Sequence, residues 1–134
     1  MTVLDQTVNM RSIYDAYQAR TFEQAAEVFA DDAEIVNVAT GDSYVGREGY
    51  LQLARGWAAA FPDLRVELVH YQAGEGWAVA EYVIRGTHTG AMISNGGFIP
   101  PTWSQVDFRL CDAMQLREGR IVRLVDRIAY INHD

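Results

Sequence analysis

Two aspartates interrupt the apolar faces of two strands predicted near the end of this 134-residue chain. Asp126 divides an alternating apolar face made up of Val122, Leu124, Ile128 and Tyr130. Asp112 divides the corresponding face of the preceding strand, made up of Phe108, Leu110, Met114 and Leu116. Because the turn predicted at Glu118-Gly119 makes these strands neighbours, both carboxyl groups are expected to point into one apolar interior.

A carboxyl group in such a place can act as a general acid or base. Burial disfavours its charged form and a second carboxylate nearby repels it, so both effects raise its pKa. A carboxyl group that titrates near neutral pH can take or give a proton during catalysis. The structural alternative is that each aspartate accepts hydrogen bonds from buried tyrosine hydroxyls or backbone amides. Two such residues on adjacent strands favour the functional interpretation.

His88 is the third candidate catalytic residue. It shares a strand face with Tyr82 and with small residues that leave space beside its ring, so it could orient an aspartate or relay a proton. A strand-end histidine bonded to its own turn is the structural alternative. The side chains expected to contact a substrate around the same interior are Tyr14, Asn37, Trp57, Tyr82 and Tyr130.

The sequence predicts no metal site and no phosphate-binding loop. It contains one cysteine, Cys111, and three histidines that are far apart, which gives no spacing suited to a metal ion. The single cysteine also excludes a disulfide framework. It has no glycine-rich phosphate motif, and no nucleophile and histidine at a spacing typical of covalent catalysis.

Three helices and a series of strands are predicted to position these residues. Apolar residues at helical spacing predict one helix of about four turns around residues 10–17, a second from a Thr21/Gln24 capping box to Phe29, and a third over 47–60. Alternating patterns predict strands at 33–39, 64–68, 77–88, 105–117 and 120–131. The irregular segment 89–103 is expected to form a lid or mouth. This order predicts one α+β domain over residues 1–134, with a curved antiparallel sheet wrapped around three helices and a conical internal cavity.

The composition excludes several classes of protein. With 49% hydrophobic and 22% charged residues, the chain is globular rather than disordered. Its 18 acidic and 11 basic residues, the latter all arginine, give a net charge of −7 and argue against nucleic-acid binding. No apolar run approaches the roughly 18–20 residues that cross a bilayer, and the N-terminus lacks the pattern of a signal peptide. We therefore expect a cytoplasmic protein with no nucleic-acid or membrane partner.

Several segments resemble the SnoaL-like polyketide cyclase family of the nuclear transport factor 2-like superfamily. They are residues 59–66 (AAFPDLRV), 85–90 (RGTHTG), 99–102 (IPPT) and 117–122 (REGRIV), and residues 29–33 (FADDA) are a feature of the whole superfamily. The resemblance covers nearly the whole chain in the right order. It implies a cone-shaped α+β barrel, a homodimer formed through the outer sheet face, and catalysis without a cofactor.

The resemblance also implies roles for individual residues. In the best-known cyclases of the family, an aspartate on the last strand is the base of an intramolecular aldol closure, and Asp126 matches its position. A histidine that these cyclases carry one strand earlier is replaced here by Asp112. Related ketosteroid isomerases have a protonated aspartate at the Asp112 position and an oxyanion-hole tyrosine that resembles Tyr14, whereas their base falls on Asn37. The arginine–aspartate pair of related epoxide hydrolases is absent, since Leu110 stands two residues before Asp112.

These observations combine into the hypothesis of a cofactor-independent cyclase that acts on an apolar, polyketide-like small molecule. Asp126 would remove a C–H proton, while a neutral Asp112 would donate a hydrogen bond to the enolate oxygen, helped by Tyr14 or Asn37. The same site would suit an epoxide-opening or ether-forming cyclase, a dehydratase or an isomerase. A non-catalytic module for small-molecule binding or dimerisation is the alternative from another class, and such a module needs no pair of buried carboxyl groups.

Overall fold

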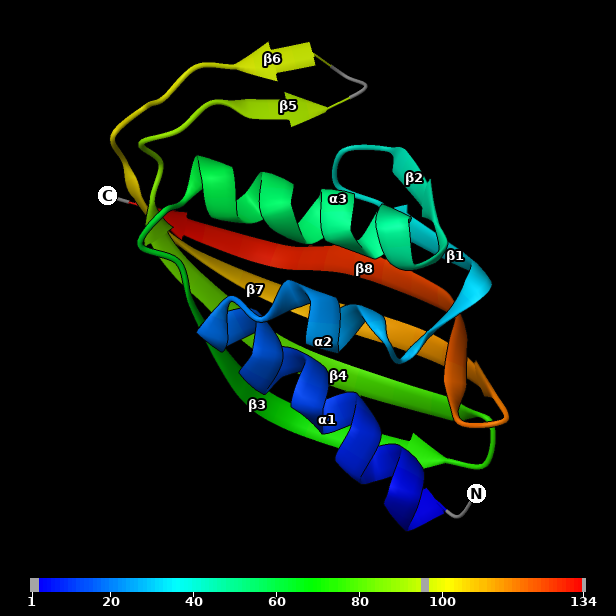
Figure 1. Ribbon diagram of the computed structural model, residues 1–134. Coiled ribbons are helices and arrows are strands. Elements are labelled where there is room, and N and C mark those ends of the chain that lie inside the picture. Colours follow the sequence, from blue (N-terminus) through cyan, green and yellow to red (C-terminus); the bar gives the residue numbers. More distant parts are fainter. Residues whose placement is uncertain (1–2, 95–96, 134) are drawn as a thin grey trace.

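The computed structural model describes residues 3–94 and 97–133, with the side chains of residues 3–10, 94, 130, 132 and 133 outside this description. Its elements, in chain order, are α1 (Val3–Ala19), α2 (Phe22–Ala26), β1 (Phe29–Asn37), β2 (Asp42–Val45), α3 (Gly46–Ala60), β3 (Arg65–Gly74), β4 (Trp77–Thr87), β5 (Met92–Ser94), β6 (Gly97–Ile99), β7 (Gln105–Arg117) and β8 (Arg120–His133) (Figure 1). No helix in these described ranges is both long and apolar enough to cross a membrane.

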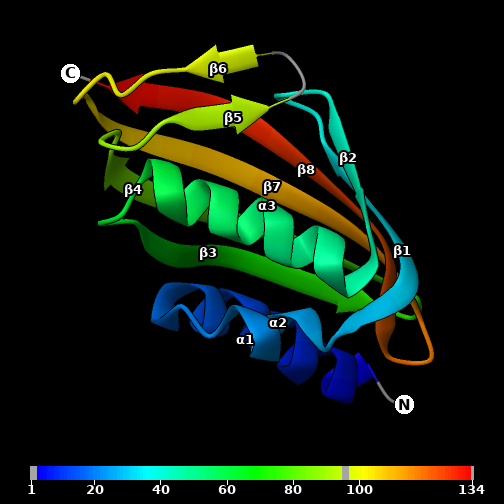
Figure 2. The ribbon, with the colours of Figure 1, turned by 45° about the horizontal axis from the view of Figure 1, so that its top comes forward.

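A curved sheet of six strands in the order β2-β1-β8-β7-β4-β3 forms the body of the protein. The helices lie on its concave side, with α1 packed against β3 and α3 packed against β1 (Figure 2). The predicted α+β architecture is therefore confirmed. One detail differs from the prediction, because β1 pairs with β8 in parallel while the other pairs are antiparallel. Since β1 and β8 are far apart in sequence, no hairpin fixes their relative direction.

The second predicted helix ends earlier than expected. It stops at Ala26, and Phe29 begins β1, where it is paired with Ile121 and fully buried. Phe29 therefore continues the apolar spacing of the helix because it is buried in a strand, and not because the helix extends to it. The predicted capping box is also wrong, since the Thr21 hydroxyl donates to the backbone oxygen of Ala16 instead of capping α2.

Three short strands fall where none was predicted. β2 has four residues, and β5 and β6 form a separate two-stranded hairpin within the predicted irregular segment. Segments of three or four residues are too short to carry a recognisable alternation. The hairpin lies beside α3 (Figure 2). The apolar side chains of Ile93 and Phe98 in it are exposed.

The β7–β8 turn and a register shift next to it bring the two aspartates together. Glu118 and Gly119 both have positive φ angles, 55° and 78°, as a tight two-residue hairpin requires. The turn alone would place Asp112 opposite Val125, but a register shift between Gln115 and Leu116 adds one residue on β8, so Asp112 lies directly opposite Asp126. Because opposite residues of an antiparallel pair lie on the same face, both carboxyl groups point to the concave side. The prediction from the sequence is confirmed at this point.

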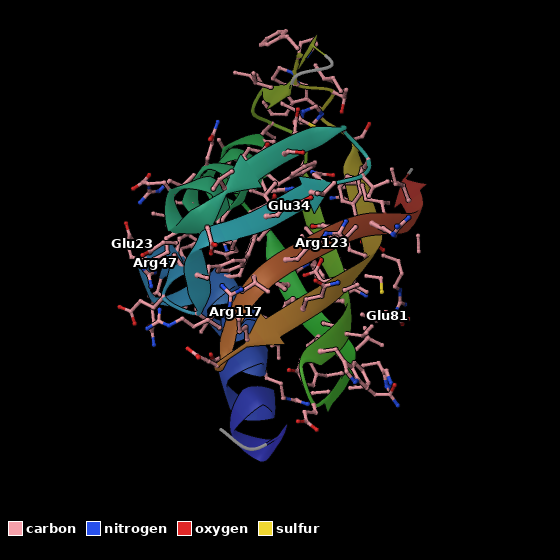
Figure 3. The ribbon with its side chains drawn as sticks, turned by 90° about the vertical axis from the view of Figure 1, so that its right-hand side faces the viewer. Glu23, Glu34, Arg47, Glu81, Arg117 and Arg123 are labelled. Atoms are coloured by element: carbon pink, nitrogen blue, oxygen red, sulfur yellow. The ribbon has the colours of Figure 1, made fainter. Side chains whose placement is uncertain are left out.

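The outer face of the sheet carries charged side chains. Because burial of these charges would be costly, their positions determine which side of each strand faces the core. Arg123 on β8 lies 3.8 Å from Glu34 on β1, and Arg109 on β7 lies 3.1 Å from Glu81 on β4. Figure 3 shows Glu34 and Arg123 close together on this surface. The inner face instead joins a core whose largest fully buried side chains are Phe29, Phe61, Ile35, Leu64, Ile84, Leu110 and Ile121.

Two glycines of α3 provide a matched test of this packing. Gly46 has φ +70°, and a Cβ there would collide with the backbone oxygen of Asp31, whereas a Cβ on Gly56 would meet open space. We expect Gly46→Ala to lower the free energy of unfolding by about 2 kcal/mol or more, because it adds this collision to a strained backbone. Gly56→Ala should raise it by roughly 0.5–1 kcal/mol, since alanine favours the helix. Urea unfolding of both variants checks this, and a neutral Gly46→Ala would contradict it.

Candidate active site

The two aspartates are joined through one tyrosine hydroxyl. The Tyr82 oxygen on β4 lies 3.1 Å from Asp112 Oδ1 and 3.2 Å from Asp126 Oδ2. From α1, the Tyr14 hydroxyl donates a hydrogen bond of 2.8 Å to Asp112 Oδ2. Each of these four residues is at most 6% exposed. Four separate elements, α1, β4, β7 and β8, therefore supply one buried hydrogen-bond network.

This geometry requires a proton on one of the carboxyl groups. The Tyr82 hydroxyl has a single hydrogen, so it donates to one carboxylate only. Its contact with the other group is favourable if that group is protonated and donates to the Tyr82 oxygen. Two ionised carboxylates at this separation would also repel each other strongly in a dry interior.

The electrostatics indicate which aspartate keeps the proton. Burial raises the pKa of Asp112 well above its ordinary value of 3.8, and the charge of Asp126 raises it further, against the hydrogen bonds from Tyr14 and Tyr82. Burial raises the pKa of Asp126 to about 7, opposed by its hydrogen bond with Tyr82. Burial therefore favours the protonated form of both carboxyl groups, and a charge on Asp126 favours it further at Asp112. With the proton on Asp112, Tyr82 would accept from Asp112 and donate to Asp126.

Three polar atoms beside this network are buried and have no hydrogen-bond partner among the described residues: Asp126 Oδ1, Tyr17 Oη and Tyr50 Oη. All three residues line one small cavity of about 30 Å³, which we call the inner chamber. The full lining of the inner chamber is Ile13, Tyr14, Tyr17, Tyr50, Leu53, Trp57, Tyr82, Ile84, Asp112, Leu124 and Asp126. Unsatisfied buried polar atoms are costly, and their grouping around a cavity is typical of a binding site.

A larger cavity of about 230 Å³, which we call the outer cavity, adjoins the inner chamber. Its lining residues are Asn37, Thr40, Asp42, Tyr44, Gln52, Leu53, Gly56, Trp57, Met92 and Ile93. Leu53 and Trp57 on α3 line both cavities and thus separate them. Trp57 is held in place by Phe108, whose ring centroid lies 5.1 Å away, and by Phe61 at 5.7 Å.

The structure brings five of the predicted site residues together at the inner chamber: Tyr14, Trp57, Tyr82, Asp112 and Asp126. Asn37 is paired with Asp126 along the strands, but its side chain lines the outer cavity and its Oδ1 accepts from the backbone amide of Ala39.

The remaining two predictions fall elsewhere. His88 does not line either cavity: its Nδ1 lies 2.9 Å from the Thr102 hydroxyl, its ring packs against Phe61, and its buried Nε2 has no partner among the described residues. Tyr130 lies in β8 opposite Arg109, but its side chain is outside the described part of the chain.

Tyr17 and Tyr50 are the residues that the sequence interpretation did not include in the site. Both lie on apolar helical stripes, Tyr17 three residues after Tyr14, and Tyr50 three residues before Leu53. The sequence did carry a signal for both residues. A tyrosine hydroxyl on a core-facing helical stripe needs a hydrogen-bond partner, just as a buried aspartate does.

No group of three or more histidine, cysteine or carboxylate side chains within the described ranges is placed to hold a metal ion. The inner chamber is lined instead by two carboxyl groups and four tyrosine hydroxyls in an otherwise apolar wall. Such a set of groups can move protons and donate hydrogen bonds.

The raised pKa of Asp126 makes stability depend on pH in a defined direction. Because the fold favours the protonated form, its contribution to stability is complete below pH 3.8 and is lost as pH rises to about 7. We expect Asp126→Asn to remove a fall of roughly 2–4 kcal/mol in the free energy of unfolding over this window. Urea unfolding at a series of pH values measures it.

The matched control is Asp15→Asn, at an exposed aspartate of α1, which should keep the wild-type pH profile. If the Asp126→Asn profile is parallel to that of the wild type, Asp126 does not titrate as described.

Comparison with known proteins shows the family to which the chain belongs. A SnoaL-like domain model matches residues 10–124, whereas no curated protein sequence matches the chain. A proposed SnoaL-like polyketide cyclase from Jannaschia sp. CCS1 superposes with a TM-score of 0.80 at 14% identity, over 94% of this chain and 86% of its own. IdmH, a proposed polyketide cyclase from Streptomyces antibioticus, has a TM-score of 0.71 and 24% identity over 96% and 91%. An epoxide hydrolase from M. tuberculosis, of the LEH-like type, has a TM-score of 0.68 and 17% identity over 94% and 84%. The chain belongs to the SnoaL-like domain family.

Proposed function

We propose that this protein is an enzyme that removes a proton from a carbon next to a carbonyl group in an apolar, polyketide-like molecule and then closes a ring. The observation that carries the proposal is the state of the Asp126 carboxyl group. Its Oδ2 is held by Tyr82, its Oδ1 is buried and has no donor among the described residues, and Asp126 is one of the residues that line the inner chamber. A general base needs such a fixed and unoccupied lone pair.

The proposed reaction balances without a cofactor. Asp126 Oδ1 takes the proton, the electron pair of the C–H bond forms the enolate double bond, and the carbonyl oxygen becomes negative. The enolate carbon then attacks a second carbonyl carbon of the same molecule, which forms the new C–C bond and an alkoxide. The alkoxide recovers the proton from Asp126, so the enzyme returns to its starting state.

The neutral Asp112 supports the base rather than reacting itself. Through Tyr82 it supplies a hydrogen bond that fixes the ionised Asp126, and Tyr14 fixes Asp112 in turn. A base with a pKa of about 7 is half ionised at neutral pH, so it is available both to take and to return a proton. The raised pKa of Asp126 depends on an interior that excludes water, and the aromatic side chains that line the inner chamber provide it.

The cavity volumes indicate how a substrate would be placed. The inner chamber, at about 30 Å³, holds little more than a water molecule, whereas pockets for drug-sized ligands measure roughly 300–1,000 Å³. The reacting carbonyl would therefore enter the inner chamber while the rest of the molecule lies in the outer cavity. Leu53 and Trp57, which separate the two, must shift when substrate binds.

Two of the alternative reactions share the proposed first step. Isomerisation and dehydration of a carbonyl compound both begin with removal of a proton from the carbon beside the carbonyl, so the same base would serve. A purely binding role is less well supported, because burial of a carboxyl pair lowers stability without any benefit to binding an apolar ligand.

Exchange of carbon-bound hydrogen tests the first step without knowledge of the natural substrate. We expect the wild type to accelerate deuterium incorporation from D2O into the α-carbon of 2-tetralone, an apolar bicyclic ketone, as followed by proton NMR. Asp126→Asn should reduce this rate by roughly 10²–10⁴-fold, the usual contribution of a general base. Asp15→Asn should match the wild type. Full exchange activity in Asp126→Asn would refute the assignment of the base.

Trp57 should decide which substrates reach the base. Trp57→Leu shortens the side chain between the cavities, so we expect it to raise the kcat/KM for exchange into a tricyclic homologue of 2-tetralone relative to 2-tetralone itself, by about tenfold. Trp77→Leu, at an exposed position of β4, is the control and should leave the ratio unchanged. An unaltered ratio in Trp57→Leu would mean that substrate enters by another route.

A further inference from the structure

The negative oxygen formed in the proposed reaction needs hydrogen-bond donors inside the chamber. Among the side chains that the structure describes, no lysine, arginine or histidine lines the inner chamber, so tyrosine hydroxyls and the Asp112 carboxyl are the candidate donors there. Two of the hydroxyls are already engaged, since Tyr14 donates to Asp112 at 2.8 Å and Tyr82 lies between the two aspartates. In the proposed protonation state, the proton of Asp112 is directed at Tyr82. The donor role that the sequence interpretation gave to Asp112 with Tyr14 or Asn37 would therefore require these hydrogen bonds to rearrange.

Two tyrosine hydroxyls of the inner chamber take no part in these hydrogen bonds. Tyr17 Oη and Tyr50 Oη are both buried and both lack a partner among the described residues. Their rings are fixed by neighbouring aromatics, since Tyr17 meets Phe22 edge-on at 5.5 Å and Tyr50 stacks on Phe29 at 4.6 Å. Burial raises the pKa of both hydroxyls, so both keep their hydrogen at neutral pH.

We infer that Tyr17 and Tyr50, rather than Tyr14 and Asp112, donate the hydrogen bonds that stabilise the enolate oxygen of the substrate. This inference rests on the proposed function, and it defines the ligand more closely: an apolar molecule with a carbonyl or phenol oxygen that becomes anionic when bound. The two hydroxyls come from α1 and α3, and Asp126 comes from β8, so donors and base belong to opposite walls of the same chamber. Fixed donors of this kind act without reorganisation when the charge develops.

A phenol that ionises near neutral pH reports on these donors directly. We would titrate the protein with 4-nitrophenol and follow the visible absorption of its phenolate, which stands in for the enolate. In the wild type and in Asp126→Asn, we expect Tyr17→Phe and Tyr50→Phe each to weaken phenolate binding by about 10- to 100-fold, the range for a hydrogen bond to a charged group. Tyr14→Phe should weaken it less than threefold.

Two controls separate an electrostatic role from a structural one. The neutral analogue 4-nitroanisole has almost the same shape and carries no charge, so its affinity should change less than twofold in Tyr17→Phe and Tyr50→Phe. Tyr71→Phe, on β3 outside both cavities, should leave the affinity for both ligands unchanged.

The outcomes distinguish this inference from the proposed function. If Tyr14→Phe weakens phenolate binding as much as the other two variants, or if the wild type does not bind the phenolate, the assignment of donors is overturned. If phenolate binding depends on Tyr17 and Tyr50 while 2-tetralone gains no deuterium, the donors stand and the proposed base chemistry fails. Loss of 4-nitroanisole binding in parallel with 4-nitrophenolate would show that the tyrosines only shape the cavity, which also overturns the inference.

Discussion

One hydroxyl group placed between two carboxyl groups determines the properties of this site. Tyr82 lies within hydrogen-bond distance of both Asp112 and Asp126, and it can satisfy both only while one carboxyl group is protonated. The two aspartates, which have the same chemistry in isolation, are thereby made different. Tyr14 donates on the Asp112 side, whereas Asp126 Oδ1 has no partner among the described residues, and this completes the asymmetry. In the reaction proposed above, one carboxyl group keeps its proton and the other acts as the base.

Much of the remaining structure keeps Tyr82, Asp112 and Asp126 in place. The turn at Glu118-Gly119 and the register shift beside it fix the pairing of β7 with β8, and this pairing places the two aspartates opposite one another. The ion pair with Glu34 keeps Arg123 on the convex face, so a slip of β8 by one residue would bury its guanidinium group. Parallel pairing with β1 covers the other side of β8, which removes its free edge.

The residues that could be predicted from the sequence are those on long, regular strands. The alternation over β7 and β8 was enough to place Asp112 and Asp126 on the inner faces of neighbouring strands, but their direct pairing depends on a register shift that the apolar pattern does not show. The residues that could not be predicted depend on contacts between distant elements. Asn37 ends β1 and His88 directly follows β4, yet whether each one meets a cavity depends on where α3 and the 89–103 segment pack. Short β2, β5 and β6 carry too few residues for any pattern, and Phe29 fits a helical stripe as well as a buried strand.

Tyr17 and Tyr50 illustrate a different limit. Their positions on apolar stripes were visible, but a tyrosine hydroxyl usually finds a partner when buried, so sequence alone favours a core role. It is the three-dimensional count of donors and acceptors that singles them out, because the hydroxyls of Tyr14 and Tyr82 are already used.

The β5–β6 hairpin has an evolutionary consequence. It forms its own small sheet outside the six-stranded one, and it supplies Met92 and Ile93 to the wall of the outer cavity while the aspartates and their tyrosines come from other elements. Substitutions in the hairpin can therefore reshape the outer cavity with little cost to the core or to the hydrogen-bond network of the aspartates. A fold of this kind can diversify through a few exposed residues, which is one physical route by which a single scaffold comes to carry different binding sites.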